Sequence, residues 1–382
     1  MSSSFGFGPV SKAAAIAGEI KRRLPQMETH FFGDRFTLRF AELSKAFDLL
    51  IEAEVDDSAQ VKKIIPQLKN YDAVFSVLNL PLLPLWRKSF GSLYFVDSLV
   101  WMWREPPRGA ENAEIYFVQD YLATPARIEK WSETLRIISV PPIGILPKHD
   151  YSLIPVNERK NRLLVNFSGC SNQYVNSKIY EIYVATLSKI IDDEASEKFE
   201  EIEICVNQTL AEQLKMRFSR SSVKIGFLPK PEFLQKLAES RFLLTAPGIT
   251  TTLEAVALKT PLGFLLPQND SQAVLSEIYR QQIGESLTMA FSRFNEKLAF
   301  PTSLDDFENL EQPIEAAVER MIFILENQQS KLKQFTAEML NKSNDNALES
   351  LRSNIRQTWH QSGQKVIVEK VFGNPAVASN EF

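Results

Sequence analysis

The stretch at residues 241–272 constrains the fold most, because a strand, a loop, a helix and a second strand follow one another in it. A short apolar run at 242–246 ends at Pro247-Gly248, which is typical of a buried strand that enters a turn. A helix at about 251–258 comes next, and a second apolar strand follows at 262–266. Two strands joined by one helix lie parallel in a sheet. Both loops therefore reach the same edge, where open α/β folds bind ligands.

The loop after the first of these strands carries groups that suit a nucleotide diphosphate. Gly248 would let a ligand come close to the backbone. The N–H groups of Thr250, Thr251 and Thr252 would stand at a helix N-terminus, where a phosphate binds favourably. Glu254, one turn further along the helix, could accept two hydrogen bonds from a ribose diol. An ordinary strand–helix–strand unit with a surface glutamate is the alternative interpretation.

Asp270 and Gln272 begin the next helix, where their side chains could address the hydroxyls of a sugar. The whole pattern is a glycine, a threonine three residues later, a glutamate six residues later, a strand bounded by proline, and Asp-x-Gln. It resembles the donor-site signature of GT-B glycosyltransferases, in particular the peptidoglycan N-acetylglucosaminyltransferases and related nucleotide-sugar transferases. The resemblance implies that Glu254 holds the nucleotide ribose and that Gln272 contacts the donor sugar. Ala273 stands where the family often has a second glutamine, which leaves the identity of the sugar open.

Two further loops of the C-terminal half resemble parts of the same donor site. A strand at 162–167 ends in Ser-Gly-Cys-Ser, which resembles the loop that GT-B enzymes place under the donor diphosphate. The residues assigned to this role are Ser168, Gly169 and Ser171. A strand at 223–227 runs into a segment that resembles the family's loop for the nucleotide base, with Phe227 and Leu228 as the candidate contacts.

Apolar runs alternate with helical patterns through the N-terminal half as well. The runs lie at 28–33, 49–55, 72–78, 92–97, 114–119 and 135–140. Such alternation predicts a mainly parallel, doubly wound α/β sheet. A stretch rich in proline and charge at about 145–160 lacks periodicity and indicates a domain junction. With 382 residues, the chain is long enough for two domains, each with its own core.

The expected architecture is α/β, with two Rossmann-like domains that face each other across a cleft. Residues 1–150 form the N-terminal, acceptor-side domain, and residues 151–345 form the nucleotide-sugar domain, whose end carries a long amphipathic pattern at 313–339. The resemblance to GT-B proteins implies that a last helix, at 346–365, crosses back onto the N-terminal domain. Residues 366–382 are expected to form a tail.

The start of the chain lacks the residue that the resemblance would make the general base. Gly6-Phe7-Gly8 reads as a turn into a helix, but Pro9 stands where GT-B enzymes commonly carry a histidine. Few residues precede the turn, so the first strand is expected to be truncated or absent. Asp97 is the candidate replacement, since it ends an apolar strand and nearby tryptophans could raise its pKa by desolvation. The alternative is that Asp97 caps the following helix and that the tryptophans pack in the core.

The segment at 78–88 is strongly apolar and ends in Trp86, Arg87 and Lys88. It could touch a membrane surface or a lipid-linked acceptor, because an aromatic ring and two cations suit that boundary. Its two prolines argue against a regular amphipathic helix. A buried loop or the wall of an acceptor pocket is the alternative.

The composition argues against several other classes of site. A net charge of −4 does not fit a general nucleic-acid binder. Two cysteines are too few for a disulfide framework. With only three histidines besides them, a metal site built on these residue types is not expected. The N-terminal residues lack a signal-peptide core, and no apolar run is long enough to cross a membrane, so a cytoplasmic location is expected.

Together these features predict metal-independent transfer of a hexosyl group from a nucleotide diphosphate sugar, with UDP-linked donors expected, to an unidentified acceptor. No cofactor besides the donor substrate is expected. Two alternatives stay open: a hydrolase or epimerase of nucleotide sugars on the same fold, and a non-catalytic subunit that binds a nucleotide sugar. The sequence specifies neither the acceptor nor the oligomeric state.

Overall fold

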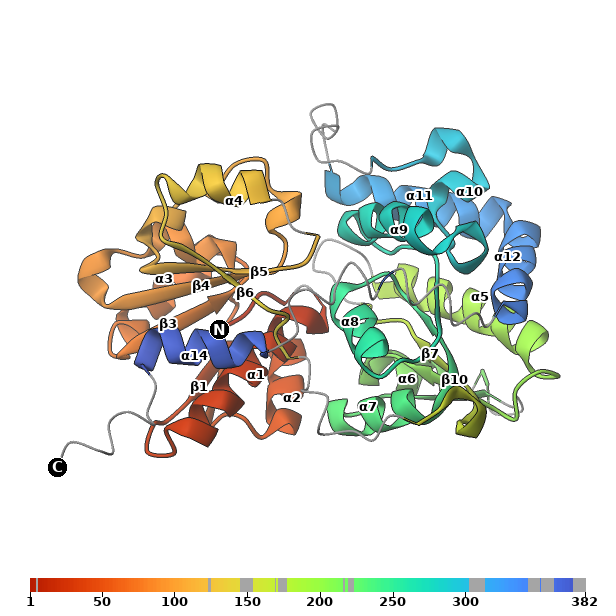
Figure 1. Ribbon diagram of the computed structural model, residues 1–382, viewed down its shortest axis with the longest axis horizontal. Helices are drawn as coiled ribbons and strands as arrows, with labels where there is room; N and C mark the ends of the chain where they lie inside the picture. The colour runs from red at the N-terminus through yellow and green to blue at the C-terminus, as the bar shows by residue number, and fades with distance from the viewer. Residues whose placement is uncertain are drawn as a thin grey trace. The chain divides into compact units, whose positions relative to one another are not determined.

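The structure is a computed structural model of the 382-residue chain. It describes residues 1–4, 6–122, 125–144, 154–168, 170, 177–215, 217–218, 223–301, 313–342, 351 and 361–373. The chain forms two compact units (Figure 1). Unit 1 contains Met1–Pro147 and Thr358–Phe382, and unit 2 contains Lys148–Gln357. The division falls inside the stretch where the sequence predicted a junction.

Unit 1 is built on a parallel sheet of four strands in the order β3-β4-β5-β6. These strands are β3 (Ala73–Val77), β4 (Ser92–Asp97), β5 (Ile115–Gln119) and β6 (Ile137–Val140). A separate parallel pair consists of β1 (His30–Gly33) and β2 (Leu49–Glu52). All six strands fall within the six apolar runs of the sequence, which confirms the parallel α/β prediction. Strands covered on both faces carry continuous apolar residues, and this makes them easy to find.

The N-terminal residues pair with the unit 1 sheet through a single bridge. Ser2 pairs in parallel with Val77 of β3, and Ser3 N donates to Val77 O at 3.0 Å. The predicted glycine turn follows, with Gly6 in the left-handed region at φ 71°, and helix α1 (Phe7–Arg23) begins directly after it. The turn into a helix that the sequence predicted at this point is therefore present.

Helices cover both faces of the unit 1 sheet (Figure 1). On one face, α1 and α14 (Gly363–Phe372) share a buried cluster with Val96 of β4 and Phe117 of β5. On the other face lie α3 (Ser58–Leu68) and α4 (Pro125–Ser132). The remaining helices of unit 1 are α2 (Arg35–Ser44) and the short 3₁₀ helices η1 (Leu80–Leu85), η2 (Lys88–Phe90), η3 (Val100–Met102) and η4 (Ala110–Asn112).

Helix α14 differs from the prediction, which placed the tail at 366–382. The helix continues to Phe372 because Ile367 and Val368 are fully buried in the cluster that it shares with α1. The boundary placed between residues 365 and 366 therefore falls within a helix. Most of the crossing helix predicted at 346–365 lies outside the described residues.

Unit 2 is built on five parallel strands in the order β11-β10-β7-β8-β9. The strands are β7 (Lys160–Asn166), β8 (Glu201–Cys205), β9 (Val223–Gly226), β10 (Ser240–Thr245) and β11 (Leu262–Phe264). The helices are η5 (Val156–Glu158), α5 (Ser177–Ala195), α6 (Gln208–Lys215), α7 (Lys230–Glu239), α8 (Ile249–Ala257), α9 (Asp270–Ile283), η6 (Glu285–Leu287), α10 (Phe291–Phe294), η7 (Glu296–Leu298), α11 (Pro313–Asn327) and α12 (Gln329–Asn341). The amphipathic pattern at 313–339 thus forms two helices, because the chain leaves the helical conformation at Gln328.

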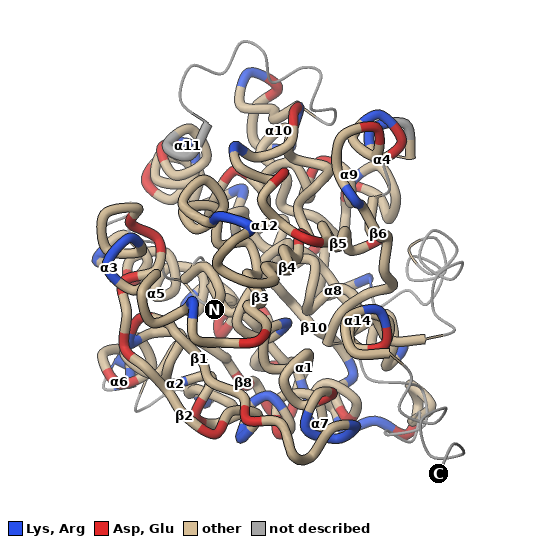
Figure 2. Tube along the Cα trace, turned by 90° about the vertical axis from the view of Figure 1, so that its left-hand side faces the viewer, with Lys and Arg blue, Asp and Glu red and all other residues tan. Residues whose placement is uncertain are grey.

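Charged residues are distributed over the helices that surround the two sheets. Figure 2 shows lysines and arginines interspersed with aspartates and glutamates, for example along α3, α4 and α7.

No helix within the described ranges combines the length and the apolar character that are needed to cross a membrane.

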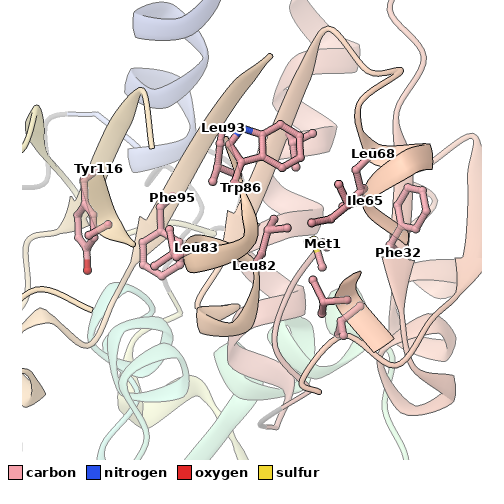
Figure 3. Packing of buried hydrophobic residues seen from close by; sticks show 14 of the residues in the cluster. Met1, Phe32, Ile65, Leu68, Leu82, Leu83, Trp86, Leu93, Phe95 and Tyr116 are labelled. Atoms are coloured by element: carbon pink, nitrogen blue, oxygen red, sulfur yellow. The ribbon is translucent and has the colours of Figure 1, made fainter. Parts of the chain in front are cut away.

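The apolar segment at 78–88 belongs to the core of unit 1. It contains η1, and its side chains Leu82, Leu83 and Trp86 are at most 2% exposed. Figure 3 shows them in a cluster with residues of β4 and β5. These side chains are not available to a membrane, so the predicted membrane contact through them is wrong. The alternative of a buried loop is confirmed.

Candidate functional site

The predicted donor residues lie where the strand order of unit 2 reverses. From the central strand β7 the chain runs outward through β8 and β9, and it then returns to β10 and β11 on the other side. The loops after β7 and β10 therefore leave the carboxyl edge of the sheet in opposite directions. Open α/β sheets bind their ligands in the crevice at such a point. These are the two loops that the sequence assigned to a diphosphate.

Helix α8 begins in the loop after β10, slightly earlier than predicted. Its N-cap, Gly248, has φ −117° and ψ 150°, an extended conformation that any residue can adopt. A Cβ at this position would meet only Ala246 O, at 3.9 Å, so the glycine leaves open space in front of the first turn. The N–H groups of residues 249–251 have no acceptor within the helix, and such a helix start suits an anion.

The three threonines of α8 have different roles. Thr252 is fully buried and donates its hydroxyl to Gly248 O at 2.5 Å, so its side chain stabilises the helix start instead of facing a ligand. Its backbone N–H also donates to Gly248 O, at 3.3 Å, which corrects the prediction that this N–H faces a phosphate. Thr250 and Thr251 are half-buried, and Thr251 Oγ1 accepts a hydrogen bond from Asn166 Nδ2.

Asn166, the last residue of β7, joins the two loops. Its Nδ2 donates to Thr251 Oγ1 and its Oδ1 accepts from Ser168 N, both at 3.0 Å. Ser168 and Cys170 lie in the left-handed region, with φ 62° and 42°, a conformation that is enriched at ligand sites. The other two predicted residues of this loop, Gly169 and Ser171, lie outside the described residues. The sequence analysis missed Asn166, although a polar residue that ends a buried strand was a signal for it.

A buried glutamine ties a third loop to this edge. Gln268 follows β11, is 2% exposed and donates its Nε2 to Phe167 O at 2.8 Å. Its Oε1 accepts from Cys170 Sγ at 3.4 Å. Burial raises the pKa of the Cys170 thiol well above its ordinary value, which disfavours the reactive thiolate form. The loops after β7, β10 and β11 thus form one hydrogen-bonded edge, and Gln268 was not anticipated from the sequence.

Glu254 lies in the second turn of α8, behind the turn that carries the threonines. It is 5% exposed, and its Oε1 lies 2.8 Å from the Nζ of Lys230 in the first turn of α7. Lys230 closely follows Phe227 and Leu228, which are half-buried and which the sequence assigned to the nucleotide base. An ion pair therefore brings the predicted ribose and base segments together. Lys230 was missed, because the pairing arises only from the packing of two helices.

Asp270 and Gln272 direct their acceptors into the protein. Asp270 Oδ1 accepts from Ala317 N of α11 at 3.1 Å, and burial raises the pKa of Asp270 to about 6. Gln272 Oε1 accepts from Gln268 N at 3.0 Å. Both side chains are less than one-tenth exposed. Asp270 links α9 to α11, and Gln272 holds the loop after β11, so the structure gives no support to their assignment to sugar hydroxyls.

Asp97, the predicted base, is fully buried at the end of β4. Its Oδ1 accepts from Leu99 N at 2.6 Å. Its Oδ2 accepts from Trp103 Nε1 at 2.9 Å and from Tyr116 OH at 2.6 Å. Both oxygens are thus committed to donors of the protein itself. This geometry does not suit a base that must reach an acceptor, and it supports the alternative in which Asp97 caps the following turn beside packed tryptophans.

The burial of Asp97 predicts a pH-dependent stability of unit 1. Burial raises the pKa of Asp97 from 3.8 to about 6, against the opposing hydrogen bonds from Tyr116, Leu99 and Trp103. The native carboxyl thus binds its proton more tightly than the unfolded one, so its stabilising contribution is complete below about pH 4 and is lost as the pH rises through about 6. A shift of about two units corresponds to about 3 kcal/mol.

We expect Asp97→Asn to remove about 3 kcal/mol of the fall in unfolding free energy between about pH 4 and about pH 7. Urea titrations followed by tryptophan fluorescence measure this, because all five tryptophans belong to unit 1. Asp72→Asn, at an exposed position, is the control and should leave the pH dependence unchanged. An Asp97→Asn protein with the wild-type pH dependence would contradict the prediction.

Asp120 follows β5 at the same edge of the sheet, one strand away from Asp97. It is half-buried, and burial raises the pKa of its carboxyl above the ordinary value. Its backbone N–H donates to Val140 O at 2.8 Å, whereas its carboxylate has no hydrogen bond or ion pair with the residues that the structure describes. An uncommitted, partly desolvated carboxylate at a carboxyl edge suits proton transfer. The sequence analysis missed it, although it is the first acid after an apolar strand.

Other parts of the described chain offer weaker sites. A cavity of about 510 Å³ in unit 1 is lined by residues such as Ser92, Glu114 and Arg136. These residues lie at the amino ends of β4, β5 and β6, opposite to the edge where parallel sheets bind ligands. Within the described ranges, no group of three or more His, Cys, Asp or Glu side chains could hold a metal ion.

Comparison with known proteins defines the fold. No protein-family model matches the chain, and no curated protein matches its sequence. The solved structure of Os79 from O. sativa in complex with UDP matches 99% of this chain and 99% of its own length, with a TM-score of 0.55 and 12% identity. This chain has the GT-B fold.

Two further GT-B structures match over nearly their whole length. The spinosyn forosaminyltransferase SpnP covers 96% of this chain and 97% of its own, with a TM-score of 0.51 and 11% identity. The apo UGT2 of Phytolacca americana covers 98% of each chain, with a TM-score of 0.50 and 12% identity. At such identities the likeness establishes the GT-B fold, and the substrate has to be argued from the site.

Proposed function

We propose that the chain is a glycosyltransferase that binds a UDP-linked sugar at the carboxyl edge of the unit 2 sheet. One observation carries the proposal: at the strand reversal of a GT-B fold, an open helix start stands one turn in front of a buried glutamate. The N–H groups of the first turn of α8 would bind the diphosphate, and Glu254 would accept hydrogen bonds from the ribose. The UDP in the Os79 structure, which shares the fold, supports uridine diphosphate as the nucleotide.

In the proposed reaction, an acceptor hydroxyl attacks the anomeric carbon of the donor sugar. The bond between that carbon and the diphosphate oxygen breaks, and UDP leaves with the bonding electrons. The N–H groups at the start of α8 stabilise the leaving diphosphate, and one such oriented donor is worth about 3 kcal/mol of barrier. A base takes the acceptor proton, and Asp120 replaces Asp97 as our candidate because its carboxylate has no partner among the described residues.

Glu254→Ala tests the donor site. We expect it to weaken UDP binding by about tenfold to a hundredfold, because hydrogen bonds to a charged group are lost. Isothermal titration calorimetry measures the affinity. The control is Glu203→Ala, which removes another mostly buried glutamate that pairs with a lysine of α7, Lys236, and should leave the affinity unchanged. Equal UDP affinity in wild type and Glu254→Ala would remove Glu254 from the site.

Turnover and binding assays with the wild-type protein test the alternatives left open by the sequence. Release of UDP from a UDP-sugar in the absence of any acceptor would indicate a hydrolase. Binding without turnover across a broad panel of acceptors would indicate a non-catalytic nucleotide-sugar subunit. A glycosyltransferase releases UDP at an appreciable rate only when its acceptor is present.

A further inference from the structure

The lysine that pairs with Glu254 stands at the proposed ribose position. Lys230 Nζ lies 2.8 Å from Glu254 Oε1, and the two side chains are 25% and 6% exposed. They come from different helices, the first turn of α7 and the second turn of α8. The cation is therefore at the rim of the site and the carboxylate is behind it.

The second oxygen of Glu254 has no partner in the described part of the chain. Its Oε2 takes part in no hydrogen bond or ion pair there, and this atom is not fully buried. A buried carboxylate is destabilised when it loses its cation, so Lys230 keeps Glu254 compensated and fixes the direction of this oxygen. The pair thus presents a free acceptor and an ammonium group side by side.

This arrangement matches the chemistry of a hydroxyl. A carboxylate only accepts hydrogen bonds, an ammonium group only donates them, and a hydroxyl does both. A ribose hydroxyl beside the pair can donate to Glu254 and accept from Lys230 at the same time. A deoxyribose lacks one of these hydroxyls, and it would leave the charged groups without that partner.

We propose that Lys230 and Glu254 together select ribonucleoside diphosphates over their 2′-deoxy counterparts. The inference rests on the proposed function, since it places the nucleotide ribose at Glu254. In it, Lys230 is a specificity-determining residue and Glu254 is the group that it holds in place.

Calorimetry with UDP and 2′-deoxyuridine diphosphate tests this proposal. We expect the wild-type protein to prefer UDP by about tenfold to a hundredfold, and Lys230→Met to reduce the preference to less than about threefold. Lys230→Arg keeps a cation and should keep most of the preference. Lys236→Met is the matched control, because Lys236 lies in the same helix at a similar exposure of 24% but pairs with Glu203 and Glu232.

The outcomes separate the two proposals. A wild-type protein that binds neither nucleotide would refute the proposed function together with this inference. A wild-type protein that binds UDP but shows no preference, or a Lys230→Met protein that keeps the wild-type ratio, would refute the inference alone. If Lys230 had a merely structural role, its replacement would weaken the binding of both nucleotides equally and leave the ratio of their affinities unchanged.

If Lys230→Met fails to fold, the doubly substituted Lys230→Met/Glu254→Gln protein, which buries no unpaired charge, should show the same loss of preference for UDP.

Discussion

Replacing Asp120 with asparagine is expected to lower the rate of sugar transfer by about 10²- to 10⁴-fold, while UDP affinity stays within about twofold of wild type. Asparagine keeps the size of the side chain but cannot take a proton from an acceptor hydroxyl. The nucleotide is proposed to bind to unit 2 and Asp120 lies in unit 1, so binding and turnover should separate. Steady-state kinetics with an acceptor found in the panel of acceptors and calorimetry with UDP measure the two quantities.

The pH profile gives an independent readout of the same residue. Burial raises the pKa of Asp120 above its ordinary value, so kcat/KM should rise with pH through a pKa that is higher than that of an exposed aspartate. Asp120→Asn should remove this limb of the profile. A purely structural role of Asp120 would lower the rate without removing the limb.

Asp97→Asn is the informative comparison, because Asp97 ends the neighbouring strand at the same edge. Its carboxylate is enclosed by Leu99, Trp103 and Tyr116, so its replacement should alter the stability of unit 1 more than the pH profile of turnover. If instead Asp97→Asn removes the limb and Asp120→Asn retains it, Asp97 is the base and our assignment of Asp120 is wrong.

The strands of each sheet could be predicted from the sequence because each strand is marked by its own short run of residues. Parallel strands that are buried on both faces are continuous apolar runs, and β4 agrees with the predicted 92–97 at both ends. The loops after β7 and β10 could be recognised by their polar residues, and parallel pairing places them at one edge of the sheet. The strand order that puts them at a reversal was not predicted, because it depends on pairing between distant segments.

The roles of single side chains could not be predicted in this way, because they depend on residues that are distant in the sequence. The Oδ2 atom of Asp97 accepts from the hydroxyl of Tyr116, which comes from the next strand. Thr252 is the third of three equivalent threonines, and only the position of the helix start turns its hydroxyl back to Gly248. Residues 366–372 of α14 were assigned to a tail because their short apolar pattern forms a helix only through packing beside α1.

Helix α8 is held at its far end by a buried arginine, and Arg159→Met should therefore destabilise unit 2 by about 3–5 kcal/mol. Arg159 is 8% exposed, and its guanidinium donates to Leu258 O at the end of α8 and to Thr260 Oγ1, both at 2.9 Å. It also donates to Ile154 O at 3.0 Å. Methionine fills the space but leaves these buried acceptors without their donor. Arg241→Met, which removes an exposed arginine with one hydrogen bond of 3.3 Å, should change stability by less than about 0.5 kcal/mol.

The stability of unit 2 cannot be followed by tryptophan fluorescence, because this unit contains no tryptophan. Hydrogen exchange of the β10 amides during a urea titration provides the probe. A ligand stabilises only the folded unit that binds it. If the nucleotide binds at α8, UDP at about 100 times its Kd should therefore raise the unfolding free energy of unit 2 in the Arg159→Met protein by about 2.7 kcal/mol. Protection by UDP of unit 1 instead, with no effect on β10, would place the nucleotide elsewhere and contradict the proposed donor site. An unchanged stability of Arg159→Met would show that the arginine does not anchor the donor helix.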